Sequence, residues 1–189
     1  MRKHFLDRGQ SLLMIIDLQE RLMAVMDQAQ KVYRNTCLML AVCQQLEMPV
    51  VVTEQYPRGL GRTVPDISEK LGQHLLIEKI TFSAVTAEML AQLQELGRKQ
   101  ILVAGSETHV CVFQTVRDLV AVGYEVYLLQ DAVCSRRKRN YKNGLQLMKE
   151  EGAVLTDTET AVFDLLKKGD TPGFRAILAQ LKQLSGHRK

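Results

Sequence analysis

The sequence predicts an α/β fold in which a parallel β-sheet lies between two layers of helices, a three-layer αβα arrangement. Six short apolar runs are continuous rather than alternating, which is typical of strands buried on both faces. Segments with helical spacing separate these runs, and such alternation implies right-handed crossovers between parallel strands. The length of 189 residues and the hydrophobic fraction of 46% fit a single domain over residues 1–189.

Each predicted element follows from a local pattern. The apolar runs that we expect to form strands cover residues 12–16, 49–53, 75–77, 101–104, 125–129 and 153–155. The segments with helical spacing cover residues 29–46, 86–96, 110–122, 140–150 and 158–166. Gly97, Gly123 and Gly152 each follow a helical segment and precede a strand, where a left-handed C-cap is favoured. The predicted core covers about residues 11–166, and an appended helix follows over 174–184.

The longest stretch without a clear pattern runs from Glu54 to Asp66, directly after the second predicted strand. In open α/β sheets the ligand crevice lies outside the carboxyl ends of the strands, so a long loop there favours a functional role. A surface excursion rich in Gly and Pro is the alternative interpretation.

Composition and charge exclude several classes of protein. The 25 Lys and Arg residues against 21 Asp and Glu residues give a net charge of +4, too mild to predict nucleic-acid binding. The basic run at 136–139 lacks interleaved aromatic residues, so we expect a solvated loop or a subunit contact there. No apolar run approaches the roughly 18 residues that cross a bilayer. We therefore expect no nucleic-acid or membrane partner.

The cysteines and the N-terminal residues indicate the compartment. Cys37, Cys43, Cys111 and Cys134 form no CxxC pair, so a disulfide scaffold is not expected. The first ten residues lack the apolar region of a secretory signal. These features predict a reduced, cytoplasmic protein.

Three residues that can carry chemistry follow predicted strands. Asp17 ends the first strand, Lys79 follows the third, and Cys111 opens the helix after the fourth. Carboxyl ends of parallel strands meet at one edge of the sheet, so we expect the three side chains to converge. A helix N-terminus and a lysine ammonium both favour a thiolate, which predicts a lowered pKa for Cys111. The carboxylate of Asp17 could take the thiol proton and return it to a leaving amine.

The same residues stand in motifs that resemble a family. The segments Ile-Ile-Asp-Leu-Gln at 15–19, Lys-Ile-Thr-Phe-Ser-Ala at 79–84 and Gly-Ser-Glu-Thr-His-Val-Cys-Val at 105–112 resemble the three motifs of the isochorismatase-like cysteine hydrolases. This superfamily includes nicotinamidases, N-carbamoylsarcosine amidohydrolase and true isochorismatase. The stretch Thr-Glu-Gln-Tyr-Pro at 53–57 is similar to a narrower group, the isochorismatase-domain-containing proteins of unassigned substrate.

The resemblance implies a fold and a set of roles. The strand order would be 3-2-1-4-5-6 in a Rossmann-like six-stranded parallel sheet. Cys111 would be the nucleophile, Asp17 the general acid and base, and Lys79 the cation that orients both. A cis peptide bond would join Ser106 to Glu107, and the backbone N–H groups of Glu107 and Cys111 would form an oxyanion hole.

The chain also departs from the family pattern. Nicotinamidases carry an Asp-x-His…His metal site after the second strand, where this chain has Glu54 and Gln55. The histidines have no ligand spacing; they are His4, His74, His109 and His187. We therefore predict no catalytic metal and no cofactor, and nicotinamide becomes a doubtful substrate. True isochorismatases cleave a vinyl ether and need no cysteine nucleophile, so the presence of Cys111 argues against that reaction. We assign His109 to the surface or a subunit interface, because residues at i and i+2 do not face each other on a helix.

The predicted function is metal-independent hydrolysis of a small amide or related C–N bond through a Cys111 thioester. We expect the substrate pocket to be lined by Gln19, Glu54, Tyr56, Phe82 and Arg136. A noncatalytic binding protein and a redox-responsive thiol protein remain alternatives on the same fold. We also expect a homo-oligomer, because the helix at 29–46 and the appended helix, whose apolar stripe includes Phe174 and Ile177, carry apolar surface that must be buried. Packing within the chain can cover part of this surface, and a symmetric interface would cover the rest.

Overall fold

The computed structural model describes residues 5–184. Its six strands form one parallel sheet in the order β3-β2-β1-β4-β5-β6, which confirms the predicted order. The strands are β1 (Ser11–Ile16), β2 (Val50–Gln55), β3 (Leu75–Lys79), β4 (Gln100–Ser106), β5 (Glu125–Cys134) and β6 (Val154–Thr156). The larger helices are α2 (Ala29–Leu46), α5 (Ala87–Leu96), α6 (Phe113–Ala121), α7 (Lys138–Glu150), α8 (Thr158–Leu166) and α9 (Pro172–Leu184). Short helices are α1 (Glu20–Met23), α3 (Pro57–Leu60) and α4 (Pro65–Ser68), and a π-helical turn, η1, covers Thr108–Val112.

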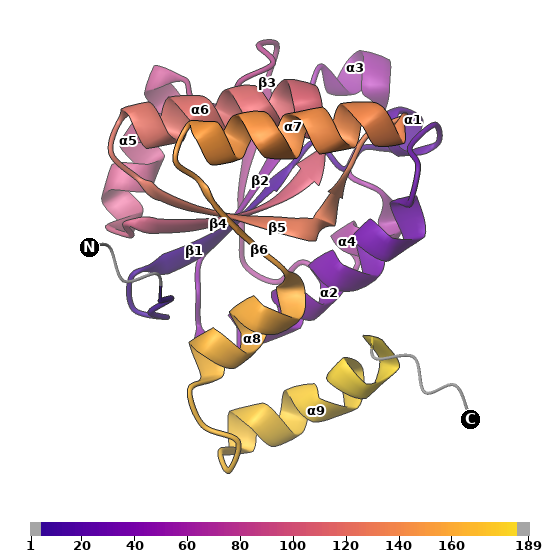
Figure 1. Ribbon diagram of the computed structural model, residues 1–189. Coiled ribbons are helices and arrows are strands. Elements are labelled where there is room, and N and C mark those ends of the chain that lie inside the picture. The colour runs from indigo at the N-terminus through magenta and orange to yellow at the C-terminus, as the bar shows by residue number, and fades with distance from the viewer. Residues whose placement is uncertain (1–4, 185–189) are drawn as a thin grey trace.

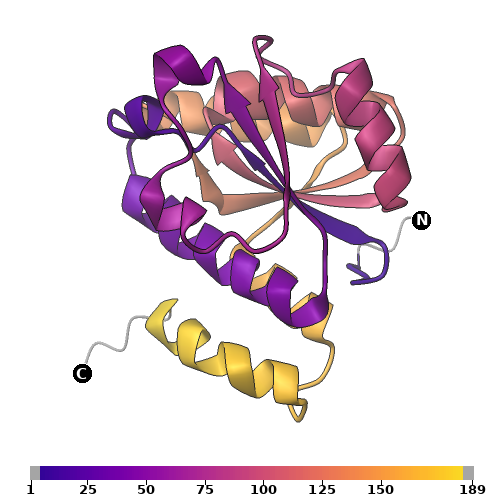
Figure 2. The same ribbon diagram turned by 180° about the vertical axis from the view of Figure 1, so that it is seen from behind.

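The helices cover the two faces of the sheet, as Figures 1 and 2 show. Helices α5, α6 and α7 lie on one face, and α2 and α8 lie on the other, with α9 outside them. Alternate residues of β1 explain this arrangement: Leu13 and Ile15 pack towards α2, whereas Leu12 and Met14 pack towards the opposite layer. Because both faces of the strand are buried, its sequence is continuously apolar.

The glycine caps have the predicted conformation. Gly97, Gly123 and Gly152 have φ angles of +62°, +92° and +97°, in the left-handed region where glycine is not penalised. Each lies between a helix and the next strand and reverses the direction of the chain.

The segment from Glu54 to Asp66 is more ordered than the sequence predicts. Strand β2 continues to Gln55, and the segment then contains α3 and the start of α4. Pro57 and Pro65 stand in the first turns of these helices, where a missing N–H costs no hydrogen bond. Helices of four residues are too short for an apolar period to appear in the sequence.

Two other boundaries differ from the prediction. The expected helix over 110–122 is divided into η1 and α6, because the turn after β4 begins as a π-helix. Strand β5 extends to Cys134, well past the predicted end at 129, and its register against β4 shifts between Val103 and Gly105.

The appended helix is buried by its own chain. Helix α9 packs against α2 and α8, with Ile177 and Leu181 2% and 5% exposed. The rings of Phe163 and Phe174 lie 6.0 Å apart. The stripe therefore packs within the chain, which is one of the two alternatives that the sequence left open, and it gives no support of its own to the expected homo-oligomer. No helix in the described part of the chain is long and apolar enough to cross a membrane.

Candidate active site

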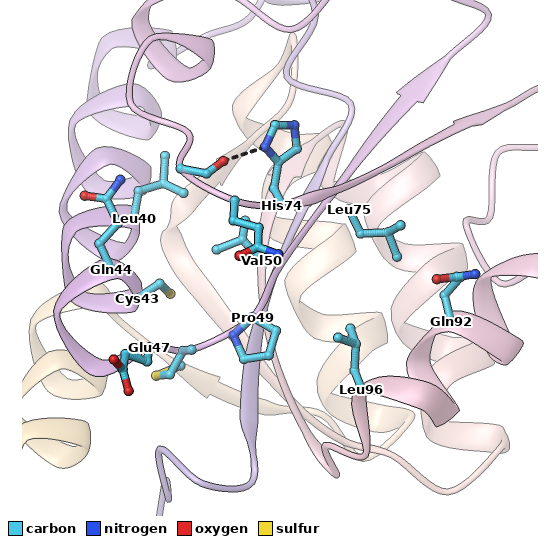
Figure 3. A pocket seen from close by; sticks show the side chains of 13 residues that line it. Leu40, Cys43, Gln44, Glu47, Pro49, Val50, His74, Leu75, Gln92 and Leu96 are labelled. Atoms are coloured by element: carbon cyan, nitrogen blue, oxygen red, sulfur yellow. Dashed lines mark hydrogen bonds between the residues drawn. The ribbon is translucent and has the colours of Figure 1, made fainter.

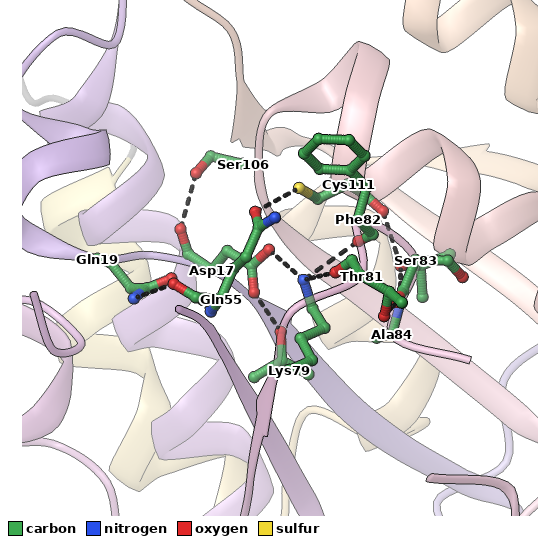
Figure 4. A network of polar contacts seen from close by, with 12 residues as sticks. Asp17, Gln19, Gln55, Lys79, Thr81, Phe82, Ser83, Ala84, Ser106 and Cys111 are labelled. Carbon is green, nitrogen blue, oxygen red and sulfur yellow. Dashed lines mark hydrogen bonds and ion pairs between the residues drawn. The ribbon is translucent and has the colours of Figure 1, made fainter. Parts of the chain in front are cut away.

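The carboxyl ends of three strands bring Asp17, Lys79 and Cys111 together, as Figure 4 shows. Asp17 directly follows β1, Lys79 is the last residue of β3, and Cys111 lies in η1 after β4. Strand β1 occupies the centre of the sheet between β2 and β4, which places Asp17 between the other two residues. The sheet order thus converts distant sequence positions into one cluster.

Asp17 and Lys79 form a buried ion pair. Lys79 Nζ lies 2.6 Å from Asp17 Oδ2, and the two side chains are 1% and 0% exposed. The lysine ammonium also donates to the carbonyl oxygens of Thr81 and Phe82, at 3.2 and 3.1 Å. Thr53 Oγ1 donates to Asp17 Oδ1 at 2.6 Å. Desolvation raises the pKa of Asp17 above its ordinary value, although Lys79 and Thr53 act in the opposite direction.

Cys111 is also buried, with 4% of its surface exposed. Its thiol donates a hydrogen bond to Gln55 Oε1 at 3.3 Å. Burial, helped by the Asp17 carboxylate, raises the pKa of the Cys111 thiol to about 12, although Lys79 and the backbone of Glu107 act in the opposite direction. The predicted depression of this pKa is therefore wrong for the resting site, because desolvation outweighs the cation and the helix terminus.

Close backbone packing fixes the turn that carries the cysteine. The peptide bond between Ser106 and Glu107 is cis, and Ser106 Oγ donates to the Asp17 carbonyl oxygen at 2.9 Å. Gly105 has a φ of +146°, and a Cβ there would lie 2.3 Å from the carbonyl oxygen of Ile16. Only glycine allows β1 and β4 to approach this closely.

Helix α7 supports the same turn from outside. A Cβ added to Gly144 would lie 2.7 Å from the carbonyl oxygen of Thr108 in η1. Thr115 Oγ1 donates to the Cys111 carbonyl oxygen at 2.7 Å and accepts the N–H of Ala84 at 2.9 Å. The turn that carries Cys111 is thus tied to both α7 and the segment after β3.

Two of the predicted pocket residues hold the segment after β2. Gln19 Nε2 donates to the carbonyl oxygens of Gln55 and Gly61, at 3.0 and 2.7 Å. Glu54 is 3% exposed, and its Oε1 accepts hydrogen bonds from the N–H and the hydroxyl of Thr63, at 2.7 and 2.8 Å. Desolvation opposes ionisation of Glu54, but Arg62 and Thr63 outweigh it and lower its pKa. These contacts give both side chains a structural role.

The other three predicted pocket residues are exposed. Tyr56 and Phe82 are 55% and 53% exposed, and both lie beside residues that contact the cluster. Arg136 donates from its Nε to Glu107 Oε2 at 3.2 Å, next to the cis peptide. Ile80, which the sequence analysis missed, is 84% exposed between Lys79 and the Phe82 segment. Contact of these residues with a substrate stays a prediction.

Sequence reasoning also missed Thr53 and Gln55. Both contact the cluster directly, through Asp17 and Cys111 respectively. They alternate with Glu54 at the end of β2, so the two-residue period of a strand was the signal that could have found them.

The histidines lie apart from the cluster. His74 is exposed, and His4 and His187 lie outside the described residues. His109 is half-buried, with Nδ1 3.1 Å from Ser135 Oγ and Nε2 3.2 Å from Asn140 Nδ2. These contacts within the chain account for its partial burial, and its expected place at the surface or a subunit interface stays a prediction. Within residues 5–184, no three His, Cys, Asp or Glu side chains are grouped as metal ligands.

A groove of about 700 Å³ lies at the other end of the strands from Cys111, where β2 and β3 begin (Figure 3). It runs between α2, the starts of β2 and β3, and α5, and its lining includes Cys43, Glu47, His74 and Leu96. Cys43 is fully desolvated, which raises its pKa to about 12, and no ion pair accompanies it there. The lining of the groove therefore lacks a buried thiol beside a buried carboxylate–lysine ion pair, which is the arrangement that Asp17, Lys79 and Cys111 form.

Comparison with known proteins places this geometry in a family. The family model described as the isochorismatase domain matches residues 11–160. The chain belongs to the isochorismatase family. Isochorismatase family protein 1A of Dictyostelium discoideum is 36% identical over 173 residues, which cover 89% of this chain and 84% of that protein.

Solved structures of similar fold agree with this assignment. A Caenorhabditis elegans protein described as MAR1 ribonuclease is 29% identical, with a TM-score of 0.90 over 95% of this chain and 93% of that one. YcaC from Pseudomonas aeruginosa, solved with hexane-2,5-diol and covalent acrylamide, is 21% identical, with a TM-score of 0.89 over 98% and 96% of the two chains. These likenesses support an isochorismatase-like hydrolase fold for the whole sheet and its helices.

Proposed function

We propose that this isochorismatase family member hydrolyses a small amide or related C–N bond through a Cys111 thioester. The observation that carries the proposal is the buried ion pair of Asp17 and Lys79, 2.6 Å apart, beside a buried thiol. Such an arrangement supplies a base, a cation and a nucleophile at one point.

The reaction divides into two halves. The Cys111 proton passes to the Asp17 carboxylate, and the sulfur attacks the carbonyl carbon and forms an S–C bond. Asp17 then gives the proton to the leaving nitrogen, the C–N bond breaks, and ammonia or an amine departs. Water next attacks the thioester while Asp17 takes its proton, and the acid leaves as the thiol is restored.

The environment of each group suits this sequence. Burial raises the pKa of Asp17, which makes its carboxylate a stronger base than an exposed aspartate. Lys79 stabilises negative charge whether it resides on the carboxylate or on the sulfur. The protons therefore move within the cluster, and the proposal requires no metal or cofactor.

Backbone groups at the cis peptide complete the site in this proposal. The N–H groups of Glu107 and Cys111 would bind the oxygen that becomes negative during attack. The Glu107 backbone lowers the pKa of the Cys111 thiol, which supports its position as a hydrogen-bond donor beside the sulfur. Exposed side chains at the rim, namely Tyr56, Phe82 and Arg136, would contact the rest of a small substrate.

Intact-protein mass spectrometry with a panel of small amides and ureides tests the proposal. We expect an acyl adduct on Cys111 and release of ammonia or amine, both lost in Cys111→Ser and both unchanged after exhaustive chelation. Binding without an adduct would favour a noncatalytic protein. Reversible oxidation of Cys111 without turnover of any amide would favour a redox role.

RNA belongs in the same panel, because one structural relative is described as a ribonuclease. The cluster is enclosed, with Lys79 and Asp17 1% and 0% exposed, and a polynucleotide backbone needs a wider opening. We therefore expect no cleavage of RNA at enzyme concentrations that turn over an amide.

We also propose that the chain forms a homo-oligomer. The support is a group of exposed apolar side chains around the site, Tyr56, Ile80 and Phe82, of which Ile80 is 84% exposed. Light scattering tests this, because a mass of about 21 kDa across micromolar concentrations would contradict it.

A further inference from the structure

Gln55 lies over the nucleophile and has no role in the mechanism above. It is the last residue of β2 and pairs in register with Lys79 of β3. Figure 4 shows its side-chain amide between Asp17 and Cys111. Its Oε1 is the acceptor for the Cys111 thiol at 3.3 Å.

The backbone of Gln55 is held firmly. Its N–H donates to Gln19 Oε1 at 2.7 Å, and its carbonyl oxygen accepts from Gln19 Nε2 at 3.0 Å. The next residue, Tyr56, donates its N–H to the Lys79 carbonyl oxygen at 2.8 Å. The amide of Gln55 therefore reaches the sulfur from a fixed point.

The orientation of the side-chain amide is also determined. Gln55 Nε2 donates to the carbonyl oxygen of Ile80 at 3.3 Å, which turns Oε1 towards Cys111. When the thiol proton passes to Asp17, Oε1 loses its donor and faces a sulfur anion. A half-buried carbonyl oxygen without a donor is costly, so a new N–H at this position is favoured.

We propose that Gln55 is a specificity-determining residue whose Oε1 accepts the N–H of the scissile carboxamide when the Cys111 proton has left. This inference rests on the proposed cysteine hydrolase site and names its substrate class: amides or ureides that carry at least one N–H on the scissile nitrogen. Esters of the same shape lack that donor and leave Oε1 unpaired, and a site built for a hydrogen bond rejects such analogues strongly.

Covalent labelling tests the proposal without requiring turnover. Acrylamide and methyl acrylate differ at the group in question, NH₂ against OCH₃, and both alkylate thiols. We take the alkylation rate with acrylamide divided by the rate with methyl acrylate, first at Cys111 and then at glutathione. The first ratio divided by the second is the amide preference that the site adds. In the wild-type protein we expect this preference to exceed about tenfold, within the range that a single hydrogen-bonding group can add.

Three variants separate recognition from structure. Gln55→Met keeps the side-chain length but has no acceptor, so the preference should fall to within about twofold of that of glutathione. Gln55→Glu keeps an acceptor, so the preference should persist although its charge slows both reagents. Gln73→Met is the matched control: Gln73 is an exposed glutamine in the groove at the start of β3, so this variant should retain the wild-type preference.

The outcomes decide the proposal independently of hydrolysis. A wild-type protein without an amide preference, a Gln55→Met variant that retains it, or a Gln55→Glu variant that loses it would each overturn the role of Gln55. Equal slowing of both reagents in Gln55→Met would show a structural role only and would also overturn it. Failure of the hydrolase proposal would appear elsewhere, as the absence of an acyl adduct with every amide.

Discussion

At the scale of single residues, the protonation of Asp17 and Cys111 depends on their burial, on the charge of Lys79 and on each other. Their convergence could be predicted from the sequence, since Asp17 and Lys79 stand at strand ends and Cys111 in the turn after a strand, and a strand end can be located from an apolar run. The sequence did not allow prediction of their electrostatics. The helix terminus and the cation are visible in a sequence, but the depth of burial that raises the pKa of Cys111 depends on the packed structure.

The pH dependence of labelling follows from that pKa. Because burial raises the pKa of Cys111 to about 12, the resting site holds a neutral thiol, and the thiolate fraction grows with pH through the whole accessible range. We expect the iodoacetamide rate at Cys111 to rise continuously from pH 6 to pH 9, with Cys111→Ser as the blank. A plateau with a midpoint below the free-thiol value of about 8.5 would contradict the raised pKa.

The ion pair predicts a pH-dependent cost for losing its cation. Lys79→Met leaves a buried carboxylate unpaired and removes an influence that lowers the pKa of Asp17. The folded state then holds the proton more tightly than the unfolded state, so stability falls as pH rises above 3.8. We expect a loss of about 3–5 kcal/mol at pH 7 and a smaller loss at pH 4 in urea unfolding.

A second substitution provides the control for this cost. Asp17→Asn in the Lys79→Met background removes the uncompensated charge, so the double variant should be more stable at pH 7 than Lys79→Met alone. An equal loss at both pH values, or no recovery in the double variant, would show that packing rather than charge accounts for the effect.

At the scale of elements, continuous apolar runs were sufficient to predict the strands, but short turns escaped. Helices α1, α3 and α4 have four residues each and bury few side chains, so no hydrophobic period marks them. The π-helical turn η1 depends on the close approach of α7, which is a tertiary contact. Because such turns are not visible in the sequence, the hydrogen bonds by which Gln19 and Glu54 hold the segment after β2 are not visible either, and contact of these two residues with a substrate stays a prediction.

Gly144 provides a test of how α7 supports the turn that carries Cys111. Alanine usually stabilises a helix interior by about 1 kcal/mol relative to glycine. Here the added Cβ would lie 2.7 Å from the Thr108 carbonyl oxygen, so Gly144→Ala must displace η1. We expect a lower Tm and slower alkylation of Cys111.

The exposed neighbour Asn143 supplies the control. Asn143→Ala should keep the wild-type alkylation rate and the wild-type Tm or slightly above it, since alanine favours a helix. A Gly144→Ala variant at least as stable as Asn143→Ala would refute the steric argument.

At the scale of the whole molecule, α9 lies outside the segment that matches the isochorismatase domain, residues 11–160. It covers α2 and α8, on the opposite side of the sheet from α6 and α7. Its position could not be predicted from the sequence, because an apolar stripe is the same whether it packs within a chain or between chains. The structure assigns the stripe to the chain's own core, so the proposed homo-oligomer would use another surface.

Shortening the side chain of Ile177 distinguishes packing of the stripe within the chain from packing between chains. Ile177 is 2% exposed against the core, so Ile177→Ala should cost about 2–5 kcal/mol and lower the Tm. Ala176→Gln, at an exposed position on the same helix, should leave the Tm nearly unchanged. Because α9 is remote from η1, alkylation of Cys111 should proceed at the wild-type rate in both variants. Light scattering should also give the wild-type mass; a smaller particle for Ile177→Ala alone would mean that the stripe lies at a subunit interface after all.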